Sequence, residues 1–256
     1  MKTIDLNADI GEADNPDWAA SEAAIVQAIS SANIACGGHA GDKASMRLTV
    51  RNAKAARVTI GAHPAYPDRA NFGRTSLILG EDIEAKALSE TLRAQIMDLA
   101  EICYSEDVRL AYIKPHGALY NDSVFDAEKA DLIAEVIADF NMDLTFLGGP
   151  NSQMGRAANT HDLPFVAEGF IDRRYTDDGH LLSRKLDGAV IQNPAARLAQ
   201  ARALATTGEV QTASGKTLTL RPGSLCVHGD SAGAVETAHQ ARAALEAEGL
   251  TIKAFA

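Results

Sequence analysis

Strand and helix patterns alternate throughout residues 3–63, TIDLNADIGEADNPDWAASEAAIVQAISSANIACGGHAGDKASMRLTVRNAKAARVTIGAH. Longer segments with helical spacing of apolar residues predict helices over Trp18–Ser30 and from an Asp42 N-cap to Ala56. Strands that alternate with helices pair in parallel and carry the helices on the outside of the sheet. Short apolar runs predict the strands themselves over Thr3–Ala8, Asn33–Cys36 and Arg57–Ala62.

The same alternation continues along the rest of the chain. It gives about seven βα units, more than the smallest doubly wound sheets and close to the eight of a common barrel. The 256 residues can bury one large core, and no low-complexity linker divides them. We therefore predict one α/β domain over residues 1–256, a single β/α barrel of about seven parallel strands with helices outside. Later strands are predicted over Leu110–Lys114, Leu144–Gly148, Phe165–Gly169 and Ser224–Val227, with a hairpin over Val210–Leu220 and a closing strand over Ile252–Phe255.

Composition excludes several classes of partner. The formal net charge is −10 and no basic run is present, so a nucleic-acid partner is not expected. No apolar stretch approaches the roughly 20 residues that span a bilayer, so a membrane partner is not expected either. Three cysteines form no Cys-x-x-Cys pair, and the first residues lack an apolar signal core. These features predict a cytoplasmic protein with reduced thiols.

Polar residues follow directly after most of the predicted strands. In a parallel barrel the carboxyl ends of all strands meet on one face, which carries the active site. Four of the seven histidines lie at such ends, where a neutral imidazole can transfer protons or bind a metal ion. The predicted catalytic residues are Asp9, His39, His63, Lys114, His116 and His228. The predicted substrate-binding residues are Asn7, Arg69, Arg74, Glu168, Asp172, Arg173 and Asp230.

The cationic candidates also have purely structural interpretations. Lys114 follows an apolar strand, so its ammonium group could instead form a buried ion pair with Glu168 or Asp172. Arg69 and Arg74 could hold their own loop together rather than bind a substrate carboxylate. Both interpretations depend on geometry that sequence spacing does not determine.

A divalent metal ion is a further hypothesis for this face. Asp9, His39 and His63 provide one carboxylate and two imidazoles, a combination that suits zinc and similar ions. Their long spacing along the chain leaves the geometry open. Cys36 and Cys226 lie near the same face, but a buried structural cysteine is the commoner case at strand ends.

The segment Ser214-Gly215-Lys216-Thr217 resembles the end of a phosphate-binding P-loop. That motif requires a glycine five residues before Gly215, where this chain has Val210, and a helix after the threonine. The following residues read as a strand instead. The sequence therefore predicts no P-loop, and this chain alone offers no familiar ATP site.

Six segments of the chain form a recognisable series of motifs. They are DLNADIGE (residues 5–12), SANIACGGHAGD (31–42), GAHPAYPDRANFGR (61–74), KPHGALYN (114–121), EGFIDRRYTDDGHLLSR (168–184) and CVHGD (226–230). Together they resemble the LamB/YcsF family, whose members are known as the A subunits of 5-oxoprolinase. The resemblance covers nearly the whole chain in the same order, and it implies a fold similar to the glycoside hydrolase/deacetylase barrels.

The resemblance implies a reaction and its partners. It implies ATP-dependent opening of the small lactam 5-oxo-L-proline to L-glutamate, with ATP and Mg²⁺ as co-substrate. It also implies 5-oxoprolinase subunits B and C as partners. Two alternatives stay open: a metal-dependent deacetylase or amidohydrolase acting on a carbohydrate or lactam, and a non-catalytic lactam-binding subunit.

Proton-transfer roles follow as hypotheses from this reaction. A lactam amide is resonance-stabilised, so phosphorylation of its carbonyl oxygen would make the ring carbon electrophilic. Asp9 with His39 or His63 would then activate water, and His116 or His228 would protonate the ring nitrogen.

The cations complete the hypothesis. Lys114 would stabilise the developing anion, while Arg69 or Arg173 would hold the substrate carboxylate through two hydrogen bonds. One departure from the family pattern is Ala65, where serine is usual in GAHP-x-YPD. If the serine hydroxyl contacts substrate, Ala65 alters the substrate preference and leaves the fold unchanged.

Overall fold

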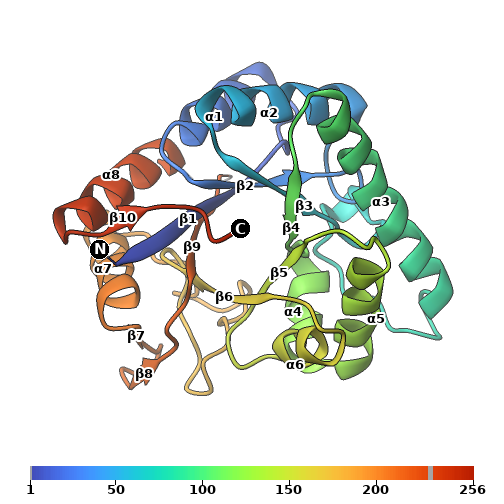
Figure 1. The fold of residues 1–256 in the computed structure, drawn as a ribbon. Helices are drawn as coiled ribbons and strands as arrows, with labels where there is room; N and C mark the ends of the chain where they lie inside the picture. The colour runs from blue at the N-terminus through green and yellow to red at the C-terminus, as the bar shows by residue number, and fades with distance from the viewer. Residues whose placement is uncertain (1, 230–232) are drawn as a thin grey trace.

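Seven parallel strands close into a barrel in the computed structural model, which describes residues 2–229 and 233–256 (Figure 1). Around the barrel the strands follow the order β1-β2-β3-β4-β5-β6-β9, and pairing of β9 with β1 completes the ring. The prediction of a β/α barrel with about seven parallel strands is confirmed. The strands are β1 (Thr3–Ile10), β2 (Ser31–Ala35), β3 (Thr59–His63), β4 (Leu110–Ile113), β5 (Thr145–Gly148), β6 (Phe165–Phe170) and β9 (Ser224–Val227).

Helices surround the strands on the outside of the barrel (Figure 1). Asp42 caps α2 as predicted, because its side chain accepts hydrogen bonds from the backbone N–H groups of Ala44 and Ser45. Helix α4, which has nine residues, has no counterpart among the predicted elements. The helices are α1 (Pro16–Val26), α2 (Lys43–Ala56), α3 (Ala85–Ser105), α4 (Gly117–Phe125), α5 (Ala127–Ala138), α6 (Gln153–Thr160), α7 (Pro194–Thr206) and α8 (Ala234–Ala247), with a short 3-10 helix at Arg69–Asn71.

The chain closes differently from the prediction at its C-terminal end. Strand β10 covers only Thr251–Ile252 and pairs with the first residues of β1, so β9 rather than the last segment closes the barrel. Phe255 packs edge-on against Tyr112 of β4, with ring centroids 5.0 Å apart. The last segment therefore lies at the amino end of the barrel, opposite the face on which the strands end (Figure 1).

The region that resembled a P-loop is an antiparallel hairpin. Strands β7 (Glu209–Gln211) and β8 (Thr217–Thr219) pair with each other, as predicted, and no helix follows the threonine. None of the helices in residues 2–229 and 233–256 combines the length and apolar character that a membrane span requires.

Strand β1 carries polar residues at alternate positions, and this pattern builds the inside of the barrel. Asn7 donates to Ser224 of β9 and accepts from Asn33 of β2, so its side chain points across the strands. Because successive side chains on a strand point to opposite faces, Asp5, Asn7 and Asp9 share the interior. The intervening residues of β1 pack into the main apolar core.

Gly61 of β3 makes room for an interior aromatic ring. A Cβ atom at this position would lie 2.2–2.5 Å from three ring carbons of Tyr112, closer than any contact that packed atoms tolerate. The ring is fully buried, and its hydroxyl donates to Asn33 Oδ1 at 2.7 Å. Gly61 therefore makes room for the Tyr112 ring, and the Tyr112 hydroxyl holds Asn33 of β2 in place inside the barrel.

We expect Asp5→Asn to reduce the pH dependence of stability. Burial raises the pKa of Asp5 to about 6, against the lowering effect of hydrogen bonds from Ser224, Ser30 and Ser31. A carboxyl whose folded pKa exceeds its unfolded value contributes stability at low pH that is lost as pH rises through the folded pKa. Between pH 5 and pH 7 this loss amounts to about 1 kcal/mol. The free energy of unfolding of Asp5→Asn should not show this decrease as the pH rises.

Urea unfolding of both proteins at pH 5, 6 and 7 measures the effect. The comparison uses the change with pH rather than the absolute free energy of unfolding, because removing the carboxylate also alters its three serine contacts. Equal changes with pH in the two proteins would contradict the assignment.

Candidate active site

A cavity of about 850 Å³ opens at the carboxyl ends of the strands. The strand-end prediction therefore located the polar face, although the individual residues contribute in different ways. Side chains from β1, β3, β4, β6 and the segments that follow them line the cavity together. The lining includes Asp9, Glu12, His63, Lys114, Glu168 and His228.

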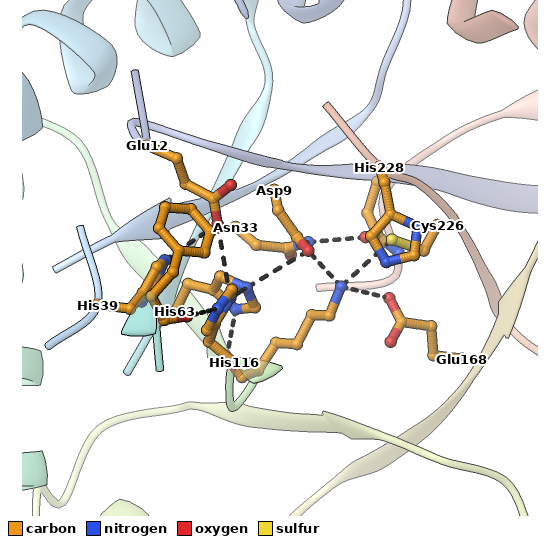
Figure 2. A network of polar contacts seen from close by, with 12 residues as sticks. Asp9, Glu12, Asn33, His39, His63, His116, Glu168, Cys226 and His228 are labelled. Atoms are coloured by element: carbon orange, nitrogen blue, oxygen red, sulfur yellow. Dashed lines mark hydrogen bonds and ion pairs between the residues drawn. The ribbon is translucent and has the colours of Figure 1, made fainter. Parts of the chain in front are cut away.

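Lys114 lies at the centre of this site and bridges two carboxylates. Its Nζ is 2.8 Å from Asp9 Oδ1 and 2.9 Å from Glu168 Oε1. Nζ also donates to Cys226 Sγ at 3.3 Å, and the three partners converge from β1, β6 and β9 (Figure 2). The side chain of Lys114 is 2% exposed, so the ion pairs are shielded from water. Of the two partners open in the sequence, Glu168 rather than Asp172 contacts Lys114.

Each charged group of this centre stabilises the ionised form of its neighbours. Burial would raise the pKa of Asp9, but the charges of His63 and Lys114 hold it well below its ordinary value. Burial would lower the pKa of Lys114, but Asp9, Cys226 and Glu168 raise it well above its ordinary value. Lys114 and Asp9 are therefore both ionised at neutral pH. Burial raises the pKa of the Cys226 thiol, which disfavours a thiolate nucleophile there.

A buried amide network fixes the orientation of Asp9. Asn33 Nδ2 donates to Asp9 Oδ1 at 2.6 Å and to Asn7 Oδ1 at 2.7 Å, and Tyr112 anchors the Asn33 oxygen. Asn7 in turn donates to Ser224 Oγ at 2.6 Å. Asn7 does not line the cavity, so it supports Asp9 rather than touching the cavity surface.

Three histidines and one glutamate gather beside this centre. His39 Nε2 lies 3.0 Å from Glu12 Oε1, and His116 Nδ1 lies 3.0 Å from His63 Nε2 (Figure 2). The His39 and His116 rings stack with centroids 3.5 Å apart. Burial lowers the pKa of both His39 and His116 well below the ordinary value, so both are neutral. We call Glu12, His39, His63 and His116 the histidine cluster.

Loop contacts bring the histidine cluster together. Gly117, at φ +56°, packs so closely on the loop after β3 that a Cβ atom would lie 2.6 Å from the Gly73 carbonyl oxygen. That carbonyl accepts from Ala118 N at 2.9 Å, while His116 N donates to Pro64 O at 2.8 Å. These contacts join the loop after β3 to the start of α4, which places the His63 and His116 side chains against each other.

His228 and Asp172 form a second pair at the rim. His228 Nδ1 lies 2.9 Å and 2.8 Å from the two carboxylate oxygens of Asp172. A carboxylate only accepts, so the proton is on Nδ1, and in the neutral ring the lone pair is on Nε2. Burial would raise the pKa of Asp172, but His228 overrides it and holds it below the ordinary value. Asp172 does not line the cavity and therefore positions His228.

Several polar atoms of the cavity wall are buried without a hydrogen-bond partner among the described residues. They are Tyr120 Oη, Arg173 Nε and Glu168 Oε2, while Glu168 Oε1 contacts Lys114 Nζ. Buried polar atoms are normally satisfied, so these atoms mark where a ligand would bond. Burial lowers the pKa of Arg173 to about 10, helped by nearby Arg184, and the guanidinium remains cationic at neutral pH.

Other predicted residues lie elsewhere. Arg69 donates to the carbonyl oxygens of Gly37 and Gly41 at 3.0 and 2.7 Å and does not line the cavity, which matches its structural interpretation. Arg74 lines the cavity with its guanidinium 4.8 Å from the Phe72 ring centroid. Asp230 lies outside the described residues.

The structure adds residues that were absent from the predicted set. Glu12 and Tyr120 line the cavity, and Asn33 and Cys226 contact its central ion pairs. Glu12 and Tyr120 do stand in polar strand-end segments, but nothing in their local pattern separates them from ordinary loop residues. Ala65 is fully buried and does not line the cavity.

Comparison with solved structures places the fold beside known barrels. A lactam utilization protein from Thermus thermophilus superposes with a TM-score of 0.89 at 33% identity, covering 99% of this chain and 100% of that one. A family 4 carbohydrate esterase from Streptomyces lividans superposes with a TM-score of 0.51 at 12% identity, covering 100% and 93%. The second likeness concerns the fold alone.

Sequence comparison gives nearly full-length relatives. The 5-oxoprolinase A subunit of Chloroflexus aurantiacus is 42% identical over 255 residues, covering 99% of both chains. That of Streptomyces avermitilis is 40% identical over 253 residues, covering 99% of this chain and 100% of the other. The LamB/YcsF family model matches residues 4–256. The chain therefore belongs to the LamB/YcsF family.

Proposed function

We propose that this chain is the A subunit of a 5-oxoprolinase and opens 5-oxo-L-proline to L-glutamate with ATP, together with subunits B and C. The observation that carries the proposal is identity of 40–42% over almost the full length with relatives of that name. The cavity supports it, because its wall combines a buried cation, carboxylates and unsatisfied polar atoms. Its volume of about 850 Å³ leaves room for a small lactam beside a second group.

The polar groups of a lactam acid match the wall of the cavity. The guanidinium of Arg173 would bind the substrate carboxylate, and the Glu168 carboxylate would accept from the ring N–H. Lys114 would exchange its weak contact with Cys226, at 3.3 Å, for the lactam carbonyl oxygen. These three assignments use the atoms that are unsatisfied or weakly bonded without substrate.

The reaction divides into activation and ring opening. The lactam oxygen would attack the γ-phosphorus of ATP, which forms an O–P bond and releases ADP. Water, deprotonated by Asp9, would add to the ring carbon, and Lys114 would offset the negative charge of the phosphorylated oxygen beside it. Cleavage of the C–N bond needs a proton on the ring nitrogen, which His228 would deliver from Nε2 in its protonated form while Asp172 holds Nδ1–H. Hydrolysis of the acyl phosphate by a second water gives glutamate and phosphate.

ATP and Mg²⁺ are proposed as substrates of the assembled enzyme. The segment that resembles a P-loop is the hairpin of β7 and β8 and lacks the P-loop form. We therefore assign nucleotide binding to the partners or to a site shared with them. A second candidate function is metal-dependent amide hydrolysis without ATP. It is favoured by one observation, the grouping of four buried metal-ligating side chains in the histidine cluster.

Glutamate formation from 5-oxoproline tests the proposal. We expect activity in a mixture of this chain with subunits B and C and ATP, and none with this chain alone, with the partners alone, or without ATP. Amide hydrolysis by this chain alone without ATP would favour the second candidate. Tight lactam binding with complex activity that is independent of Lys114 and His63 would favour a non-catalytic binding subunit.

A further inference from the structure

Backbone carbonyls fix the protons of two rings in the histidine cluster. His63 Nδ1 lies 2.8 Å from the carbonyl oxygen of Lys114, and His116 Nε2 lies 3.0 Å from that of Phe72. A carbonyl oxygen only accepts, so both nitrogens carry hydrogen. The remaining nitrogens, His63 Nε2 and His116 Nδ1, face each other across 3.0 Å. Two such nitrogens hold this distance through a cation between them, either a shared proton or a metal ion.

The two remaining members of the cluster surround the same point. Glu12 Oε1 lies 3.0 Å from His39 Nε2 and 3.5 Å from His116 Nδ1, and the four ligand atoms all lie within 4.8 Å of one another. A proton satisfies one pair of atoms at a time, whereas a metal ion contacts all four. Ligands about 2.0–2.2 Å from one zinc ion stand roughly 3.0–3.5 Å apart, which matches the three close pairs.

The surroundings of the cluster match those of metal-bound histidines. Such histidines almost always donate their second ring N–H to a carbonyl or carboxylate, as His63 and His116 do here. The four residues are 1–6% exposed, so the ligands are withdrawn from competing water. Glu12, His63 and His116 also line the cavity, which leaves the ion accessible from the substrate side.

We propose that Glu12, His39, His63 and His116 bind one divalent transition-metal ion of the zinc type. Three imidazoles and one carboxylate favour zinc or a similar ion over magnesium or calcium, which prefer oxygen ligands. The set differs from the sequence hypothesis in its carboxylate. Asp9 Oδ1 is engaged by Lys114 and Asn33, and Asp9 Oδ2 is 3.4 Å from His63 Nε2, so Asp9 adjoins the ion.

Metal binding by the full chain tests this proposal directly. The purified protein is stripped with a chelator and titrated with Zn²⁺ by calorimetry, and with Co²⁺ by visible absorption. We expect one equivalent of either ion, a rise in Tm on binding, and d–d absorption bands from Co²⁺ in a nitrogen and oxygen environment. Glu12→Gln and His39→Ala should each weaken binding by at least about 100-fold.

His161→Ala is the matched control, because His161 also pairs with a carboxylate, Asp131 at 2.9 Å, but lies outside the cavity. It should bind the ion like the unaltered protein, and circular dichroism checks that every variant is folded. The absence of stoichiometric binding in the unaltered protein, or equal affinity in Glu12→Gln and His39→Ala, would overturn the proposal and assign a shared proton to the cluster. Because the readout is the ion itself, the result does not depend on 5-oxoprolinase activity.

Discussion

Lys114→Met should abolish glutamate formation by the reconstituted enzyme, with a loss of at least about 10³-fold in kcat. Methionine keeps the length of the side chain but removes the cation that lies 2.8 Å from Asp9 and 2.9 Å from Glu168. No other cation contacts both carboxylates in the described residues, so the developing negative charge loses its stabilising partner. Near-normal turnover of Lys114→Met with subunits B and C would refute the assigned role.

The same substitution should also destabilise the fold, and this effect needs its own control. Removing one member of a buried ion network costs about 3–5 kcal/mol, because the remaining charges stay buried without compensation. Lys114→Met combined with Glu168→Gln removes one of those charges and should recover part of the lost free energy of unfolding. Turnover should stay absent in the double variant. Urea unfolding and the glutamate assay therefore separate the structural role of Lys114 from its chemical role.

Asp172→Asn should lower kcat by about 10²–10⁴-fold while KM changes little. The Asp172 carboxylate holds the proton of His228 on Nδ1 through contacts of 2.8 and 2.9 Å, which keeps the lone pair on Nε2 for proton transfer. An asparagine amide can donate to Nδ1 and so favour the opposite tautomer. A positioning role predicts this division between kcat and KM, because Asp172 itself does not line the cavity.

Asp131→Asn is the matched control for this prediction. Asp131 pairs with His161 Nε2 at 2.9 Å, but this pair lies outside the cavity and is partly exposed. We expect kcat of the control within about twofold of the unaltered enzyme, since surface pairs contribute little. A proportional rise in KM without a fall in kcat for Asp172→Asn would instead assign Asp172 to substrate binding.

The strand-end argument identified most of the central site because it relies on local periodicity. Lys114 directly follows β4, and Asp9 and Glu168 stand within the last three residues of β1 and β6; parallel strands bring such positions to one face. The same argument could not separate Arg173, which lines the cavity, from Arg69, which donates to backbone carbonyls instead. Both arginines stand in irregular segments, where side-chain direction follows from contacts with distant loops.

Contacts between distant segments also decided which residues pair. The sequence left Lys114 with Glu168 or Asp172 as partner, and the barrel register places Glu168 beside Lys114 while Asp172, beyond the end of β6, turns to His228. The histidine cluster depends on the close approach of Gly73 and Gly117. Neither relation has a signal in local sequence.

The sequence by itself determined the barrel, its polar face and the family resemblance, because hydrophobic period and motif order are local properties of the chain. Only the tertiary structure decided that Glu12 joins the histidines and that β9 rather than the last segment closes the barrel. It also decided that Asn7 positions Asp9 through Asn33. The physical reason is that strand pairing and side-chain direction at a strand end depend on packing between residues far apart in the chain. Asn7 and Ser224, bonded at 2.6 Å, are 217 positions apart.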